Sequence, residues 1–172
     1  MGTGQTLLTI GAMMLLGLVI LGTNRNIIDT GDTVMQANCG LDAVSLATSV
    51  IQEADSTAFD SSTVHGADTL LSQLTPAYAL GQDNGDPNDL NDFDDYNGLN
   101  GQGRLDSTEL STGKYYWRTR VYYVGNYSDL NQNSSVPTWT KRLDVYVWNK
   151  DLPDTVVMHS IYSYWFFGRA GR

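Results

Sequence analysis

The first third of the chain constrains the fold most, because residues 6–59 have the pattern of one long helix. Residues 6–23 form a stretch of eighteen positions without a charge. In the part that follows, apolar residues recur at intervals of three, four and seven, which places them on one face of a helix. These residues are Ile27, Val34, Ala37, Leu41, Val44, Ile51, Ala54 and Ala58. At about 1.5 Å per residue, the helix would reach roughly 80 Å, so half of it must find partners outside a domain of this size.

The uncharged stretch, residues 6–23, meets the lower end of the length range for a membrane span. A cleaved secretory signal fits it poorly, because it lacks a basic region before it and an A-x-A site after it. Gly11, Gly17 and Gly22 would weaken the helix or allow another backbone to approach closely. The sequence therefore predicts a transmembrane helix and leaves open whether it breaks near Gly17 and Gly22.

Residues 60–172 are predicted to form one compact head, in which alternating apolar and polar residues mark three strands. The strands are expected at residues 114–124, 138–150 and 155–167. The short connections between them predict an antiparallel meander. We expect the fold class to be α+β, with a long N-terminal helix over residues 1–59 packed on this small antiparallel sheet.

An acidic segment, residues 82–106, precedes the first predicted strand. Short oxygen side chains on a turn-rich backbone suit calcium, which takes about six to eight oxygen ligands. The candidate metal ligands are Asp92, Asp94, Asp95 and Asn97. The alternative is a solvated loop whose Asp and Asn side chains cap their own backbone. Calcium is the one cofactor that the sequence suggests.

The charge of the chain argues against several classes of function. The formal net charge is −9, and residues 1–103 carry thirteen acids and one base, Arg25. We expect no nucleic acid as partner, because such a surface needs clustered Lys and Arg.

A nucleophile–base pair, a transition-metal cluster and a phosphate loop are all missing from the pattern, so we expect that the protein is not an enzyme. Cys39 is the only cysteine, which rules out an intramolecular disulfide.

Three segments resemble those of type IV pilins and of the pseudopilins of type II secretion. They are residues 4–8 (GQTLL) at the start of the apolar helix, residues 47–54 (ATSVIQEA), which Phe59 and Asp60 follow, and residues 93–98 (FDDYNG). The third is similar to a segment of minor-pilin-like proteins. The chain departs from the family at its usual glutamate near the start of the helix. It has Gln5 there if Met1 is the first mature residue, and Thr9 if cleavage follows Gly4.

The resemblance implies a structural subunit that polymerises through its N-terminal helix into an extracellular filament like a type IV pilus. In such a filament the helices leave the lipid and pack together in the core. The expected filament-core residues are Gln5, Leu7, Leu8, Ile10, Met13, Met14, Leu15, Leu18, Val19 and Leu21. The residues expected to pack the helix on the head or on other subunits are Ile27, Val34, Leu41, Val44 and Ile51.

The same resemblance implies the partners and the location. We expect a homopolymer on a prokaryotic cell surface, with the inner membrane as partner before assembly and a pilus assembly machinery during it. Pseudopilins bind calcium in loops of the head, which adds to the expectation for residues 82–106. Two alternatives stay open: a pseudopilin of a secretion machine, and a monomeric membrane-anchored protein that binds a ligand or calcium through its aromatic sheet and acidic loop.

Overall fold

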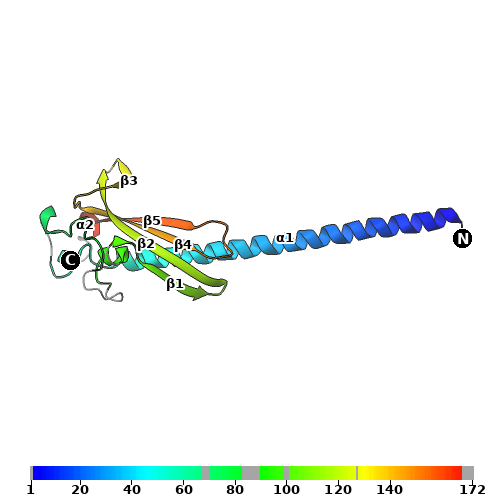
Figure 1. Cartoon of the computed structure of the whole chain (residues 1–172), viewed down its shortest axis with the longest axis horizontal. Coiled ribbons are helices and arrows are strands. Elements are labelled where there is room, and N and C mark those ends of the chain that lie inside the picture. The colour runs from blue at the N-terminus through cyan, green and yellow to red at the C-terminus, as the bar shows by residue number, and fades with distance from the viewer. Residues whose placement is uncertain (1, 67–69, 83–89, 99–100, 127, 168–172) are drawn as a thin grey trace. The chain divides into compact units, whose positions relative to one another are not determined.

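The structure is a computed structural model of the chain, and it describes residues 2–66, 70–82, 90–98, 101–126 and 128–167 (Figure 1). Its fold class is α+β, as predicted, with one long helix and a five-stranded antiparallel sheet. By its internal contacts the chain divides into a first unit, residues 1–38, and a second unit, residues 39–172. The first unit is helical, and the second unit holds the end of the helix together with the sheet.

The long helix α1 runs over Thr3–Asp55 without interruption, so Gly17 and Gly22 do not break it. It ends four residues earlier than the sequence pattern predicts. Ser56 Oγ donates to Glu53 O at 2.6 Å, and Thr57 Oγ1 donates to Ala54 O at 2.8 Å. These hydroxyl groups satisfy carbonyls that a further turn of helix would have used, and they release the chain from helical geometry.

The sheet has the strand order β1-β2-β4-β5, with β3 paired to β2. The strands are β1 Leu105–Leu110, β2 Gly113–Asn126, β3 Asp129–Asn133, β4 Thr140–Trp148 and β5 Val156–Ser163. The three predicted strands correspond to β2, β4 and β5, and they are neighbours in the predicted antiparallel order. The last one is shorter than predicted, because the chain turns into the short helix α2, Tyr164–Phe167.

The sequence pattern does not predict two strands, β1 and β3, because they lack a continuous apolar face. The sequence of β1 is LDSTEL, and all five residues of β3 (DLNQN) are exposed. Each pairs with β2, and β1 keeps an unbroken register from Leu105 opposite Arg118 to Leu110 opposite Gly113. Their positions therefore depend mainly on backbone hydrogen bonds to β2, and Leu110 of β1 is partly buried against the core.

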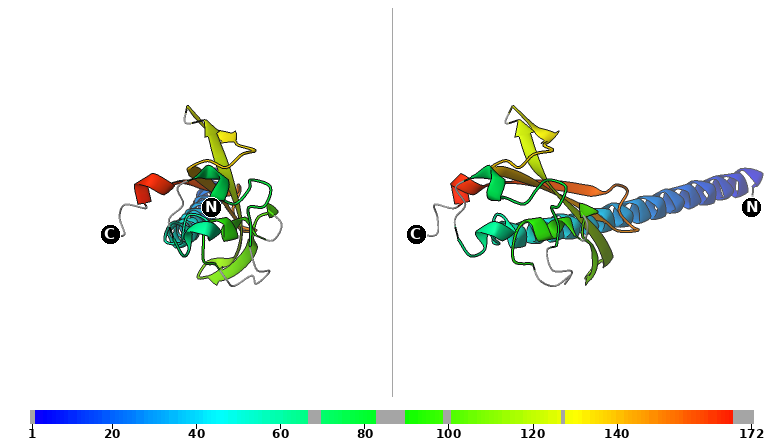
Figure 2. Two further views of the ribbon diagram at one scale, coloured as in Figure 1. Left: turned by 90° about the vertical axis from the view of Figure 1, so that its left-hand side faces the viewer. Right: turned by 60° about the vertical axis from the view of Figure 1, so that its left-hand side comes forward.

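Within the second unit, α1 packs on the sheet through small side chains (Figures 1 and 2). The buried residues of the helix are Cys39, Ala43, Ala47, Val50 and Ala54. The facing side of β2 carries large buried rings, those of Tyr115, Trp117 and Tyr123. A face of small residues on the helix complements a face of large residues on the sheet, which lets the two approach closely and fill the core.

This buried face overlaps only in part with the residues that the sequence assigns to packing on the head or on other subunits. Of these residues in the second unit, Ile51 contacts the core, whereas Leu41 is 67% exposed and Val44 is 43% exposed. Leu41 and Val44 are thus left uncovered by their own head, and their packing on other subunits stays a prediction. The sheet supplies the large side chains here, and alanine is what leaves room for them.

Candidate functional site

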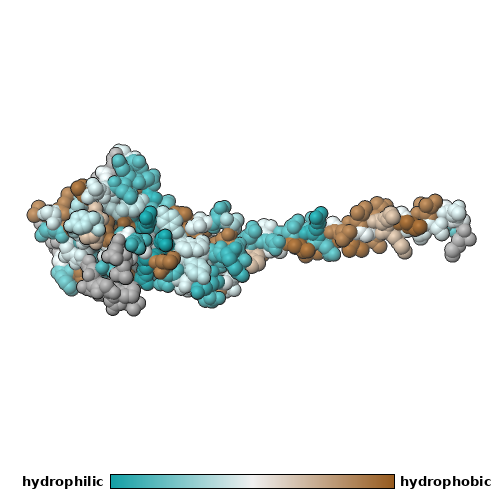
Figure 3. Space-filling view, viewed as in Figure 1, coloured by the Kyte–Doolittle hydropathy of each residue, from teal (hydrophilic) through white to brown (hydrophobic). Residues whose placement is uncertain are grey.

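The first candidate site is the apolar segment of α1 in the first unit. All ten predicted filament-core residues, from Gln5 to Leu21, are exposed. Their apolar side chains are at least half exposed, from 54% for Ile10 to 77% for Leu8. The segment has a mean hydropathy of 2.1, and Figure 3 shows it as a mostly brown part of the helix. A helix of this length and composition is compatible with a membrane anchor or with a signal sequence.

The threonine hydroxyl groups of this segment are satisfied within the helix itself. Thr6 Oγ1 donates to Thr3 O at 2.9 Å, and Thr9 Oγ1 donates to Gln5 O at 2.7 Å. At the other end, Thr23 Oγ1 donates to Val19 O at 2.7 Å. A hydroxyl that bonds back to its own helix needs no water, so these threonines are compatible with lipid or with a packed bundle of helices.

Exposed apolar residues continue along α1 beyond this segment. Ile27, Ile28, Val34 and Met35 in the first unit are between 48% and 64% exposed, and Leu41 in the second unit is 67% exposed. They include three of the residues that the sequence assigns to packing on the head or on other subunits. The apolar surface of the helix is therefore longer than a membrane span requires.

A second candidate site is a buried ionic cluster in the head, centred on Lys141 of β4. The side chain of Lys141 is fully buried, and Nζ lies 2.8 Å from Asp60 Oδ2, in contact with Asp94 Oδ1, and 2.7 Å from Phe59 O. The rings of Phe59 and Tyr123 lie beside the ammonium group, with centroids 4.5 Å and 5.1 Å from Nζ. One cation thus pairs with two buried carboxyl groups beside two aromatic rings.

The two carboxyl groups lie in opposite environments. Burial opposes ionisation of Asp60, but Lys141 and hydrogen bonds from Ser62 and Thr75 outweigh it and lower the pKa of Asp60 to about 2. Burial raises the pKa of Asp94 well above its ordinary value; the Lys141 charge opposes this rise, and the charges of Asp60 and Asp92 add to it. Asp60 is therefore a carboxylate at neutral pH, whereas burial disfavours the charged form of Asp94.

Local chain geometry brings these groups together. Asp60 caps the short helical turn Ser61–Thr63, and Phe93 N donates to Ala58 O at 2.8 Å, which joins the chain after α1 to the acidic segment. Asp94 begins the turn Asp94–Asn97, which Gly98 follows with a φ of +67°. A Cβ on Gly98 would lie 2.7 Å from the backbone of Gly103, so only glycine fits this turn.

The four predicted calcium ligands, Asp92, Asp94, Asp95 and Asn97, are all buried, not solvated. Asp92 Oδ1 accepts hydrogen bonds from Asp94 N and Asp95 N, and Asp95 Oδ2 accepts from Asp92 N. Asn97 bridges Leu80 O and Val121 N. Among the described residues, no three His, Cys, Asp or Glu side chains are grouped to hold a metal ion. Calcium binding stays a prediction; Asp83, Asp86 and Asp89 lie outside the described residues.

Sequence reasoning missed Lys141 and Asp60 as members of this cluster. A signal for Lys141 was present, because it precedes Leu143, Val145 and Val147 at the same spacing of two and so shares their buried face. No comparable signal marks Asp60, which lies 81 positions from Lys141. The sequence pattern also could not show that a lysine from the distant strand β4 would pair with Asp94 of the acidic segment.

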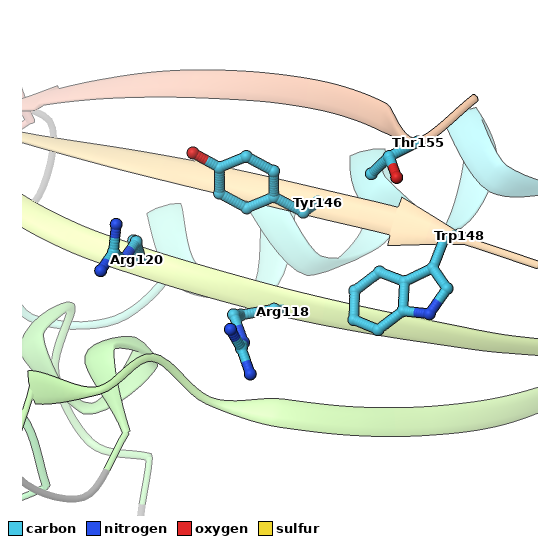
Figure 4. Close-up of a pocket in the computed structure, with 5 residues that line it drawn as sticks. All are labelled: Arg118, Arg120, Tyr146, Trp148 and Thr155. Carbon is cyan, nitrogen blue, oxygen red and sulfur yellow. The ribbon is translucent and has the colours of Figure 1, made fainter.

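The outer face of the sheet carries an open hollow of about 430 Å³ lined by Arg118, Arg120, Tyr146, Trp148 and Thr155 (Figure 4). The arginines come from β2, and the aromatic residues come from β4, with Arg118 opposite Tyr146. Strand alternation places Tyr115, Trp117 and Tyr123 on the buried face instead. The aromatic residues of the sheet therefore do not form a single exposed platform.

Comparisons of the chain with protein-family models, with curated proteins and with solved structures found no match. The class of protein is consequently defined by the architecture alone. A long N-terminal helix packed on an antiparallel sheet is a pilin-like architecture.

Proposed function

We propose that the protein is a structural subunit that polymerises through α1 into an extracellular filament like a type IV pilus. The observation that carries the proposal is the length of the exposed apolar surface on α1. A bilayer accounts for about 20 residues of an apolar helix. Exposed Ile27, Val34 and Leu41 lie beyond such a span, and the head does not cover Leu41. Packing against α1 of other subunits would bury this surface.

The glycines of α1 support the same assignment. A Cβ at Gly11, Gly17 or Gly22 would meet no atom of the described residues within 4 Å. Each glycine costs the helix about 1 kcal/mol relative to alanine, and no contact in the described part of the subunit requires it. Small residues are favoured where helices approach one another closely in lipid or in a bundle, which gives these glycines a role between subunits.

Assembly would follow from this arrangement. Before assembly, the apolar segment lies in the cell membrane of a prokaryote, and a pilus assembly machinery extracts the subunit from it. In the filament, each helix contacts different surfaces of its neighbours, and repeated contacts of this open kind generate a fibre and not a closed ring. A pseudopilin role would use the same contacts in a short fibre of a secretion machine.

The proposal is tested by shearing cells that produce the protein and examining the released fraction by electron microscopy. We expect thin filaments that contain this chain. Leu15→Lys should abolish them, because a charge in a core of helices is costly. The matched control is Val136→Lys, which places the same charge at a head residue that is 61% exposed and should leave filaments intact.

Normal filaments from the Leu15→Lys variant would overturn the proposal. Wild-type protein recovered only as detergent-soluble monomers, with and without calcium, would favour the membrane-anchored binding protein. The hollow beside Arg118 and Trp148 on the outer face of the sheet is the feature that such a protein would use.

A further inference from the structure

The buried cluster in the head holds the components of a covalent bond. We propose that Lys141 and Asp94 join in an intramolecular amide (isopeptide) bond, which forms in the folded head with the loss of one water molecule. The inference rests on the head alone and goes beyond the proposed role in a filament. Both partners are almost fully buried, at 0% and 1% exposure, and Lys141 Nζ is in direct contact with Asp94 Oδ1.

The hydrogen bonds identify Asp94, and not Asp60, as the carboxyl group that reacts. Asp60 is held by Ser62 N and Oγ, by Thr75 N and Oγ1, and by the hydroxyl group of Tyr123, at 2.8–3.2 Å. Asp94 Oδ1 contacts Lys141, and Asp94 Oδ2 has no hydrogen-bond partner among the described residues. Asp60 is therefore fixed as a carboxylate, whereas one oxygen of Asp94 is available to leave.

The charge balance of the site favours the reaction. Lys141 faces two carboxyl groups in a pocket closed by Phe59 and Tyr123. An unpaired charge in such a place is costly, and burial raises the pKa of Asp94 and so disfavours its charged form. Conversion of the Lys141–Asp94 ion pair into an amide removes one positive and one negative charge from the core.

The chemistry balances without an added reactant. The Lys141 ammonium group passes one proton to the Asp94 carboxylate, whose Oδ1 it contacts, and becomes a neutral amine beside a neutral carboxyl group. The nitrogen lone pair attacks Cγ of the protonated Asp94 carboxyl group. The C–O bond to Oδ2 breaks, and this oxygen leaves as water with the carboxyl proton and one proton from nitrogen. The product is a neutral amide beside the Asp60 carboxylate, so Lys141, Asp60 and Asp94 together carry one negative charge before and after the reaction.

Burial holds the two reacting groups together and keeps water away from them. The two groups are held in contact by different elements, β4 and the turn Asp94–Asn97, so the reaction is effectively unimolecular. Water is excluded by the aromatic rings, which disfavours hydrolysis of the product. Lys150 provides a contrast, since its side chain is 85% exposed beside Asp151 and has neither burial nor an aromatic pocket.

Intact-mass spectrometry of the denatured full-length wild-type protein tests the proposal. The chain is expected to be lighter than its sequence by one water molecule, about 18 Da. Trypsin locates the bond, because no Lys or Arg lies between Arg25 and Arg104. The linked product joins residues 26–104 to residues 121–142, with no cleavage after Lys141. This assignment does not depend on where the mature chain begins.

The variants separate the roles of the residues. Lys141→Arg and Asp94→Ala should keep the full sequence mass, and Asp60→Asn should slow formation of the bond at least tenfold, because it removes the carboxylate that holds Lys141 Nζ in place. Lys150→Arg is the control and should lose water as the wild type does. A wild-type chain with its full sequence mass, and with a separate peptide 121–141, overturns the proposal. Water loss mapped to any other pair of residues overturns it as well.

Discussion

Asp60 shows how much of the head depends on a single side chain. It accepts hydrogen bonds from Ser62, Thr75, Tyr123 and Lys141, and it caps the turn that follows α1. These donors come from the connecting segment and from two strands of the sheet. Its loss would leave several buried donors without an acceptor, which is among the costliest changes a core can undergo.

At this scale we predict that Asp60→Asn lowers the free energy of unfolding in a pH-dependent way. The pKa of Asp60 in the folded protein, about 2, lies below its ordinary value of 3.8. The folded state therefore binds fewer protons than the unfolded state, so the stabilisation is fully present above about pH 4 and is lost as the pH falls toward 2. The pH-dependent part of the difference is expected to be about 2 kcal/mol.

Denaturant unfolding between pH 2.5 and 7 measures this effect in the Asp94→Ala background, which keeps the Lys141 ammonium group because the proposed amide bond cannot form there. The difference between Asp94→Ala and the double variant Asp94→Ala/Asp60→Asn should shrink as the pH falls. This background also removes the raised pKa of Asp94, which would act with the opposite sign. Asp106→Asn, at an exposed ion pair with Arg104, is the control and should change stability little at any pH. A difference that grows toward low pH would contradict the assignment.

At the scale of elements, the helix–sheet contact of the second unit depends on small side chains. Ala43, Ala47 and Ala54 are fully buried against the sheet. We predict that Ala47→Leu destabilises the head by about 1–3 kcal/mol, because the added volume must displace packed rings. Ser45→Leu, on the exposed side of the same helix, should change stability by no more than about 0.5 kcal/mol. Thermal unfolding of the two variants compares them; equal melting temperatures would contradict the packing described.

The elements also show which features the sequence could predict. The alternation through Leu143, Val145 and Val147 predicts β4, and the structure confirms it. The exposed strands β1 and β3 carry no such alternation, so they become visible only through their pairing with β2. The buried cluster joins residues 47 and 81 positions apart, and no local pattern encodes that meeting. The sequence pattern also does not show which residues of the helix the head buries, because this packing depends on the size of side chains in the sheet.

At the scale of the whole molecule, the two units differ in whether they bury their apolar residues within the subunit. The buried hydrophobic core of the described residues runs from Cys39 to Tyr162, within the second unit. We predict that residues 39–172 alone fold and remain monomeric, because they keep this core and lack the exposed apolar residues 7–35. Circular dichroism and size-exclusion chromatography test this, with the full chain in detergent for comparison. A truncated chain without β structure, or one that still forms filaments, would contradict the division of roles.

The attachment of α1 to the sheet has a mechanical consequence. Near the start of the second unit, Thr112 Oγ1 donates to Asp42 Oδ2 at 2.6 Å, and at the end of the helix Ser160 Oγ donates to Asp55. Between these two tethers lies the row of buried alanines. A pulling force applied to α1 along its axis would load both tethers and the whole row together in shear, instead of detaching them one after another. Rupture under tension would then require many contacts to fail at once, and the head would resist such a force better than its modest size suggests.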